Sequence, residues 1–206
     1  MSAVSETIVR EYFELHEFLV RQRRKYLART REQEEEDIDF FVLNPHPQVQ
    51  AAPLPFVLGS VDLPFLDRAI VVVKGWHTGT FSISRLAASP EIFRFVEPKV
   101  FQQAARAFGK DGTPLKILIV PALPQDAKAR DESIALLRSK GIDAVIPFWT
   151  LLADLISATE INRNYQKSDL LQIIRILKNY EFFREPQMEL FKAKRKSAKS
   201  PDSLKR

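Results

Sequence analysis

The chain has 206 residues, 45% of them hydrophobic, which is enough for one sizeable core and short for two full domains. It contains no cysteine, which excludes disulfides, thiolate zinc sites and cysteine nucleophiles and fits a reducing compartment. No apolar run reaches the length of a membrane span, and the start of the chain has no apolar core of signal-peptide length. The sequence therefore predicts a soluble cytoplasmic protein without a membrane partner.

The formal net charge of +5 is concentrated at the C-terminal end. Residues 192–206 hold seven Lys and Arg against one Asp, so the rest of the chain is close to neutral. The Ser, Lys and Pro content of residues 186–206 is typical of disorder. We therefore expect a single domain over residues 1–185 followed by a disordered basic tail, which is more often solvated than bound to phosphate.

The first elements are an amphipathic helix and a strand. Apolar residues recur at helical spacing over 5–16, and Glu6 falls at the edge of the buried arc, where a first-turn carboxylate favours the helix dipole. A strand is expected at the start of 18–27. The basic residues of this segment are Arg21, Arg23, Arg24 and Lys25, and an acidic run follows over 32–37. The basic cluster predicts a surface ion-pair patch or, less commonly, contacts to phosphate.

The next predicted strand, 36–44, places two carboxylates in an apolar run. Asp37 and Asp39 are two residues apart, so they share one face of a regular strand. Residues 45–66 then contain five of the chain's thirteen prolines in a connection longer than compact domains usually have. We interpret this connection as a lid, or as an arm that packs on the surface or on a second subunit.

Residues 67–77 contain the most informative strand of the chain. The β-branched residues 70–73 predict a strand buried on both faces, and Lys74 follows at the rim of the core. Trp76 is a candidate for stacking on a nucleobase or for covering the core edge. His77 is a candidate contact at the same site, as a general base or metal ligand, although a strand-end histidine with a local hydrogen bond is the commoner role.

The second half predicts alternating strands and helices. We expect a helix over 98–108, a strand over 115–120, a helix over 127–140 and a short strand over 144–147. Such a β-α-β unit makes a parallel pair joined by a crossover helix. Two further helices are expected over 149–158 and 168–182, which completes an α/β domain with extra C-terminal helices.

The order of these elements, with three of their residues, resembles the PD-(D/E)XK nuclease superfamily, which has the restriction-endonuclease-like fold. The resemblance rests on Glu6 in the first helix, Asp39 in the Glu-Asp-Ile-Asp-Phe-Phe strand and Lys74 in the Val-Val-Val-Lys strand. It covers roughly the first 110 residues, and its order is more specific than any single piece. It implies a mixed central sheet flanked by helices.

The resemblance also implies phosphodiester hydrolysis of DNA with Mg²⁺ or Mn²⁺. Asp39 and Glu6 would be the metal ligands, since Mg²⁺ is commonly held by one or two carboxylates and substrate phosphate oxygens. Lys74 would stabilise the attacking hydroxide and the charge that develops on the phosphoryl group. No small-molecule cofactor is implied. Asp62 and Asp67 replace Asp39 as candidates if the strands pair in another register.

One departure from the family pattern is decisive for the expected activity. Val72 stands where the family has its second strand carboxylate, and a valine cannot bind a metal. Three alternatives follow: the domain has lost strong nuclease activity and still binds DNA, a carboxylate is supplied by Glu91 or Glu97, or the chain is an unrelated α/β domain. A non-catalytic interaction module that forms a homodimer is the competing functional class.

Overall fold

The computed structural model describes residues 3–23, 38–49, 52–74, 79–109 and 112–183. The strands are β1 (Leu19–Gln22), β2 (Phe40–Leu43), β3 (Arg68–Val73), β4 (Leu115–Val120) and β5 (Ala144–Pro147). The α-helices are α1 (Ala3–Leu15), α2 (Ile83–Ala87), α3 (Pro98–Ala105), α4 (Ala127–Ser139), α5 (Phe148–Ala158) and α6 (Asp169–Asn179). Short 3₁₀ helices are η3 (Ser60–Phe65), η4 (Pro90–Val96) and η5 (Arg106–Phe108).

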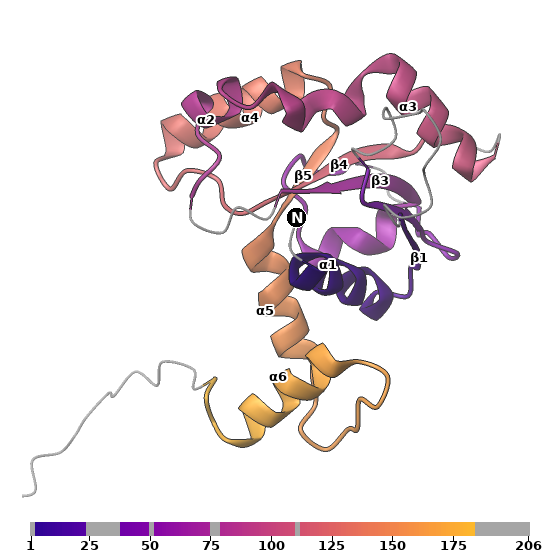
Figure 1. The fold of residues 1–206 in the computed structure, drawn as a ribbon, viewed down its shortest axis with the longest axis vertical. Helices are drawn as coiled ribbons and strands as arrows, with labels where there is room; N and C mark the ends of the chain where they lie inside the picture. Colours follow the sequence, from indigo (N-terminus) through magenta and orange to yellow (C-terminus); the bar gives the residue numbers. More distant parts are fainter. Residues whose placement is uncertain (1–2, 24–37, 50–51, 75–78, 110–111, 184–206) are drawn as a thin grey trace, which may run out of the picture.

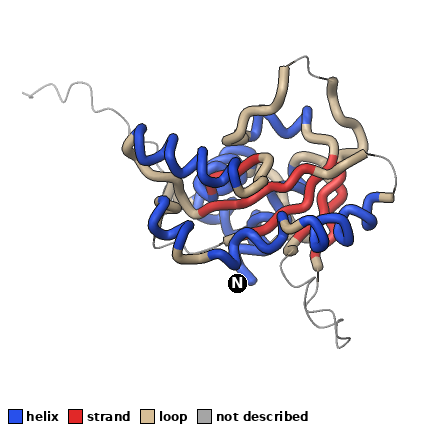
Figure 2. Tube along the Cα trace, turned by 90° about the horizontal axis from the view of Figure 1, so that it is seen from above, coloured by secondary structure: helices blue, strands red, loops and turns tan. Residues whose placement is uncertain are grey.

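The five strands form one mixed sheet in the order β1-β2-β3-β4-β5. β2 runs antiparallel to both of its neighbours, β1 and β3, with Arg21 opposite Phe41 and Phe41 opposite Ile70. β3, β4 and β5 are parallel, and α4 crosses over between β4 and β5. Figure 2 shows the strands side by side, viewed from the side of the molecule on which α2 and α4 lie. The predicted α/β class and the β-α-β unit are confirmed.

Helices cover both faces of the sheet because its central strands are apolar on both sides. Ala69, Val71 and Val73 face a core built with α1, α5 and η3. Ile70 and Val72 face a second core, which includes residues of α2, η4, α3 and α4. We call these two sides the α1 face and the α3 face (Figure 1). The continuous β-branched run of β3 is the sequence signal of a strand buried in this way.

The proline-rich connection packs against the sheet. Val57 forms a parallel bridge with Val145 of β5, and its two neighbours complete the pairing. The backbone N–H of Leu58 donates to the Val145 carbonyl at 2.9 Å, and the Val145 N–H donates to the Phe56 carbonyl at 2.7 Å. Of the alternatives expected for this connection, the described part is an arm that packs on its own domain and closes the β5 edge.

Several boundaries differ from the prediction. The strand predicted over 36–44 begins only at Phe40, and Asp37 lies outside the described residues. Ile38 and Phe40 belong to opposite cores although they are two residues apart, so the alternation breaks at Asp39. The helix predicted over 98–108 is α3 followed by η5. The last helix stops at Asn179, and Glu181 has a left-handed backbone with φ of 58°.

None of the helices in the described part is both long and apolar enough to cross a membrane.

Candidate functional site at the carboxyl end of β3

Asp39 lies just before β2 and turns its side chain toward β3. Its Oδ2 atom accepts a hydrogen bond from the backbone N–H of Val73 at 2.8 Å, and the residue is only 9% exposed. The Val73 N–H points toward β2, since the next N–H, that of Lys74, donates to Ile119 of β4 on the other side. The Asp39 carboxylate therefore replaces a backbone acceptor where β2 has not yet begun.

Lys74 follows β3 directly. Its backbone N–H continues the parallel ladder at 3.0 Å from the Ile119 carbonyl, and its side chain is partly buried. Ile70 and Val72 face the α3 side, so the alternation of a strand places Lys74 on that side as well. The hydrogen bond from Val73 to Asp39 thus brings the predicted aspartate to the residue next to the predicted lysine.

Val72 is a core residue. It is 2% exposed and packs in the core of the α3 face, which also contains Phe81, Leu86 and Phe95. A carboxylate at this position would have to be buried among apolar side chains, which is costly unless it is paired. The position at which the sequence departs from the superfamily that it resembles is therefore one where the valine packs in the core.

Glu6 is held in a different environment. Its Oε2 atom accepts a hydrogen bond from Gln22 Nε2 at 2.7 Å, which joins α1 to the last residue of β1. Both residues belong to the α1 side: neighbouring Ile8 and Val9 pack in the α1-face core, and Val20 packs against it. Strand alternation places Lys74 on the α3 face, so Glu6 and Lys74 are on opposite sides of the sheet.

The two carboxylates considered as replacements lie on the α3 side at the surface. Glu91 is exposed in η4, and Glu97 is exposed immediately before α3. Asp62 and Asp67, the alternatives to Asp39, both interact with residues close to them in the sequence. Asp62 accepts a hydrogen bond from the Gly59 N–H at 2.7 Å, and Asp67 pairs with Arg68 at 2.9 Å at the amino end of β3.

The predicted nucleic-acid contacts are only partly within the described chain. Arg21 is exposed on β1, with its guanidinium carbon 5.9 Å from the centre of the Phe41 ring. Arg23 donates its backbone N–H to the Asp39 carbonyl at 2.9 Å, which brings it to the same end of the sheet as Asp39. Arg24, Lys25 and His77 lie outside the described residues, as does Trp76.

The donor atoms of this site do not match the two-carboxylate Mg²⁺ site that the resemblance implies. One Asp39 oxygen is already bonded to a backbone N–H, Val72 offers no oxygen, and Glu6 is bonded to Gln22 on the α1 side. Within the described ranges, no three His, Asp or Glu side chains are grouped so that they could hold a metal ion. The described arrangement offers a single carboxylate beside a lysine.

Sequence reasoning missed a second polar cluster, which joins α1 to α5 and η3. The Tyr12 hydroxyl shares a hydrogen bond with Ser60 at 3.1 Å, and His16 Nε2 lies 2.5 Å from Asp154 Oδ2. The Tyr12 and His16 rings meet edge to face. Burial raises the pKa of Tyr12 to about 12. This cluster fastens the helices and the arm on the α1 face, and helical spacing alone predicted only an apolar stripe there.

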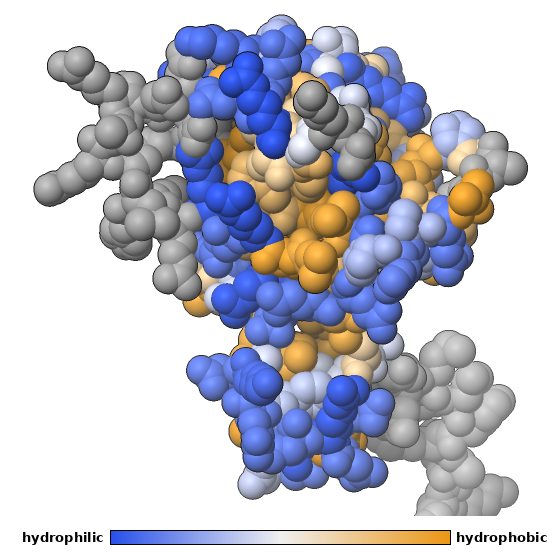
Figure 3. Space-filling view, turned by 90° about the vertical axis from the view of Figure 1, so that its right-hand side faces the viewer, coloured by the Kyte–Doolittle hydropathy of each residue, from blue (hydrophilic) through white to orange (hydrophobic). Residues whose placement is uncertain are grey.

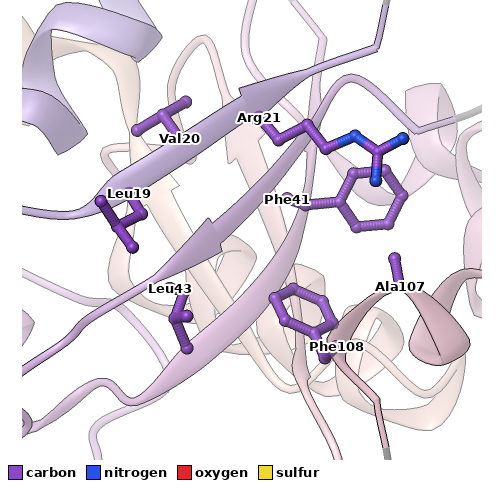
Figure 4. Close-up of a pocket in the computed structure, with 7 residues that line it drawn as sticks. All are labelled: Leu19, Val20, Arg21, Phe41, Leu43, Ala107 and Phe108. Carbon is purple, nitrogen blue, oxygen red and sulfur yellow. The ribbon is translucent and has the colours of Figure 1, made fainter.

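Sequence reasoning also missed an apolar pocket on the α3 face. It has a volume of about 290 Å³ and lies where β1 and β2 meet η5. Figure 4 shows Arg21 and Phe41 side by side on adjacent strands, with Phe108 approaching from η5. The alternation of Leu19 with Arg21 and of Phe41 with Leu43 was the available signal, since each pair shares one face of its strand.

Comparison with known proteins gave no match of this chain to a family model, to a curated protein or to a solved structure.

Proposed function

We propose that this protein binds DNA through a nuclease-like α/β domain whose metal site is incomplete, so that phosphodiester cleavage is weak or lost. The observation that carries the proposal is the approach of Asp39 to the carboxyl end of β3, where its carboxylate bonds the residue before Lys74. The resemblance requires an aspartate and a lysine in these relative positions, contributed by two adjacent strands.

The sheet supports the same proposal at a coarser level. Three antiparallel strands followed by parallel β4 agree with the mixed central sheet that the resemblance implies. Helices flank the sheet on both faces (Figure 1). A fold by itself does not establish a function, so the argument depends on the residues at the end of β3.

The chemistry that these residues can perform is recognition of phosphate. Lys74 supplies a positive charge at the rim of the sheet, and Arg23 reaches the same end through its backbone bond to Asp39. Cationic side chains bind the DNA backbone with an affinity that falls steeply as salt rises. Asp39 has a structural role that does not depend on a metal, because its carboxylate accepts a hydrogen bond from Val73 and so joins the start of β2 to the end of β3.

The first test is DNA binding as a function of salt. Binding of a fluorescein-labelled duplex should weaken linearly on a log–log plot against salt concentration, and Lys74→Ala should reduce the magnitude of the slope by about 1. Lys178→Ala is the matched control, because Lys178 bonds the carbonyl oxygens at the end of α5 and lies away from this site. Absence of duplex binding by the wild type at low salt would contradict the proposal.

The second test is cleavage of supercoiled and branched DNA with Mg²⁺ or Mn²⁺. We expect little or no nicking by the wild type. Asp39→Asn is preferable to Asp39→Ala here, since the amide oxygen can still accept the Val73 N–H while the charge is removed. Strong cleavage that is abolished by both Asp39→Asn and Lys74→Ala would show a working site and would direct attention to Glu91 and Glu97.

A second candidate function, a non-catalytic dimerisation module, is favoured by the surface of α6 and the residue that caps its C-terminal end. Ile173, Ile176 and Tyr180 are 54%, 45% and 71% exposed and recur at i, i+3 and i+7, so they form one apolar stripe. Contiguous exposed apolar surface marks interaction sites. Salt-insensitive self-association that is lost in Ile173→Glu, without DNA binding, would favour this function over the first.

A further inference from the structure

The pocket between β1, β2 and η5 combines an apolar lining with one exposed cation. Leu19 and Leu43 are paired across the two strands, and Phe41 meets Phe108 edge to face with ring centres 5.8 Å apart. Arg21 lies over the Phe41 ring. Among the described residues no carboxylate forms an ion pair with Arg21. The pocket therefore presents aromatic rings beside a positive charge.

In the described part of the chain, the helix layer leaves this part of the sheet open. α3 ends at Ala105, and η5 reaches only the rim of the pocket, so the side chains of β1 and β2 are incompletely covered. Leu19 is 61% exposed. Figure 3 faces the side on which β1 and α3 lie in Figure 1, and it shows hydrophobic surface at its centre with a hydrophilic rim. An apolar patch of this kind, rimmed by polar residues, marks a binding surface.

We infer that this pocket binds one unpaired base of a nucleic acid, with the base against Phe41 and Phe108 and its phosphate at Arg21. A volume of about 290 Å³ is just below the roughly 300–1,000 Å³ of pockets for drug-sized ligands, which suits one flat ring system. An apolar floor beside a cation fits a ligand that is flat and aromatic at one end and anionic at the other. Stacking of bases on aromatic side chains and on Arg is the common mode for single strands.

The position of the pocket links it to the proposed site. Phe41 and Arg21 are paired on the adjacent strands β1 and β2, and both lie on the α3 face, as Lys74 does. Asp39 lies two residues from Phe41, about 7 Å along the strand direction. Phe41 pairs with Ile70, four residues or about 13 Å before Lys74, so a strand with one base in the pocket would reach the carboxyl end of β3 with its next nucleotides. This inference rests on the proposed binding of DNA and specifies an unpaired nucleotide as the part recognised.

The test compares a fluorescein-labelled oligo(dT) with an abasic strand of the same length. Both carry the same phosphates, so a difference in affinity reports the bases alone. We expect oligo(dT) to bind roughly tenfold more tightly, as one stacked base provides, and Phe108→Ser to remove most of that difference. Arg21→Ala should weaken both strands and lower the salt slope by about 1.

The matched control is Arg138→Ala. Arg138 is an exposed arginine 4.8 Å from the centre of the Phe56 ring, in the same kind of contact but on α4. It should leave both affinities unchanged. Thermal unfolding of each variant separates loss of the pocket from loss of the fold, and exposed Arg21→Ala remains informative if Phe108→Ser is unstable.

The other outcomes overturn the inference in distinguishable ways. Equal affinity for the two strands, or a difference unchanged by Phe108→Ser, overturns the base pocket but leaves DNA binding in place. Binding of neither strand nor duplex overturns the proposed function and the pocket together. Loss of self-association in Phe108→Ser, with unchanged DNA affinity, would make the pocket a protein interface instead.

Discussion

The two edges of the sheet are finished differently. At the β5 edge, the arm around Val57 adds two backbone hydrogen bonds and buries Leu58 to 1% exposure. At the β1 edge, Leu19 is 61% exposed, and no strand pairs with the outer side of β1 among the described residues. Among the described residues, the protein's own chain covers one edge, whereas the outer side of β1 has no paired strand and carries an exposed leucine.

The difference separates structural residues from residues available for binding. Unpaired strand edges invite association with other chains, and proteins commonly cover them. Residues 56–58 cover the β5 edge and contribute to the core on both sides of the sheet. The β1 edge adjoins the Arg21–Phe41–Phe108 pocket and, through Gln22 and Arg23, the end of the sheet that carries Asp39. We therefore expect substitutions at the β5 edge to affect stability and substitutions at the β1 edge to affect binding.

The largest expected effect is at the closed edge. Leu58→Ala removes a fully buried side chain and leaves a cavity, so the free energy of unfolding should fall by about 3 kcal/mol. Leu19→Ala, the same change at the open edge, should lie within about 0.5 kcal/mol of the wild type. Urea unfolding of both variants measures the contrast. Equal losses at the two positions would mean that the β1 edge is covered in the intact protein.

Asp39→Ala tests the end of the sheet between these two edges. The substitution leaves the buried Val73 N–H without its acceptor, so unfolding should become easier by about 2 kcal/mol. Asp39→Asn retains an acceptor oxygen and should cost less than half as much. Denaturant titration of the two variants decides the point, and a similar loss in both would assign the stabilisation to the charge instead of the hydrogen bond.

Tyr12 tests the attachment of the arm to α1. Its pKa is about 12 in the folded protein, chiefly because of burial, against an ordinary value of 10.0. The unfolded chain releases this proton first as the pH rises, so the stabilisation is complete below pH 10 and is lost between about pH 10 and 12. The expected slope is about 1.4 kcal/mol per pH unit.

Chemical denaturation at several alkaline pH values measures that slope. Tyr12→Phe should be less stable at neutral pH by about 1 kcal/mol, since Ser60 loses its partner, and should lack the Tyr12 contribution to the alkaline slope. An unchanged slope in Tyr12→Phe would contradict this explanation.

The smallest effect on stability is expected from Leu19→Lys. A lysine on an exposed edge strand discourages association with other strands, while the exposed leucine contributes little to folding. The free energy of unfolding should change by no more than about 0.5 kcal/mol, and light scattering should show less association at high protein concentration. A large loss of stability would show that Leu19 is buried in the native assembly.

The strands and helices were largely predictable because their signals are local. The β-branched run of β3, the helical spacing of α1 and the strand–helix–strand pattern of 115–147 gave the element types and the α/β class. Boundaries were less accurate where a side chain decided them. β2 begins at Phe40 because Asp39 turns toward Val73, and no local pattern indicates a contact between residues 34 positions apart.

The candidate site was predicted in part. The approach of Asp39 to Val73, the residue before Lys74, follows from pairing β2 with β3, and the order of motifs in the sequence indicated these two strands. Glu6 was grouped with them by resemblance, whereas the structure places its carboxylate with Gln22. The order of the motifs along the chain does not indicate which of the two faces of the sheet α1 covers, so it could not show on which side Glu6 would lie.

The sequence by itself determined the element types, the buried nature of β3 and the absence of a carboxylate at Val72, since these depend on residue identity and short-range periodicity. Only the tertiary structure decided that residues 56–58 close the β5 edge, that Asp39 bonds Val73 and that Arg21, Phe41 and Phe108 form one pocket. Each of these contacts joins segments far apart in the chain, and such contacts follow from strand order and layer packing.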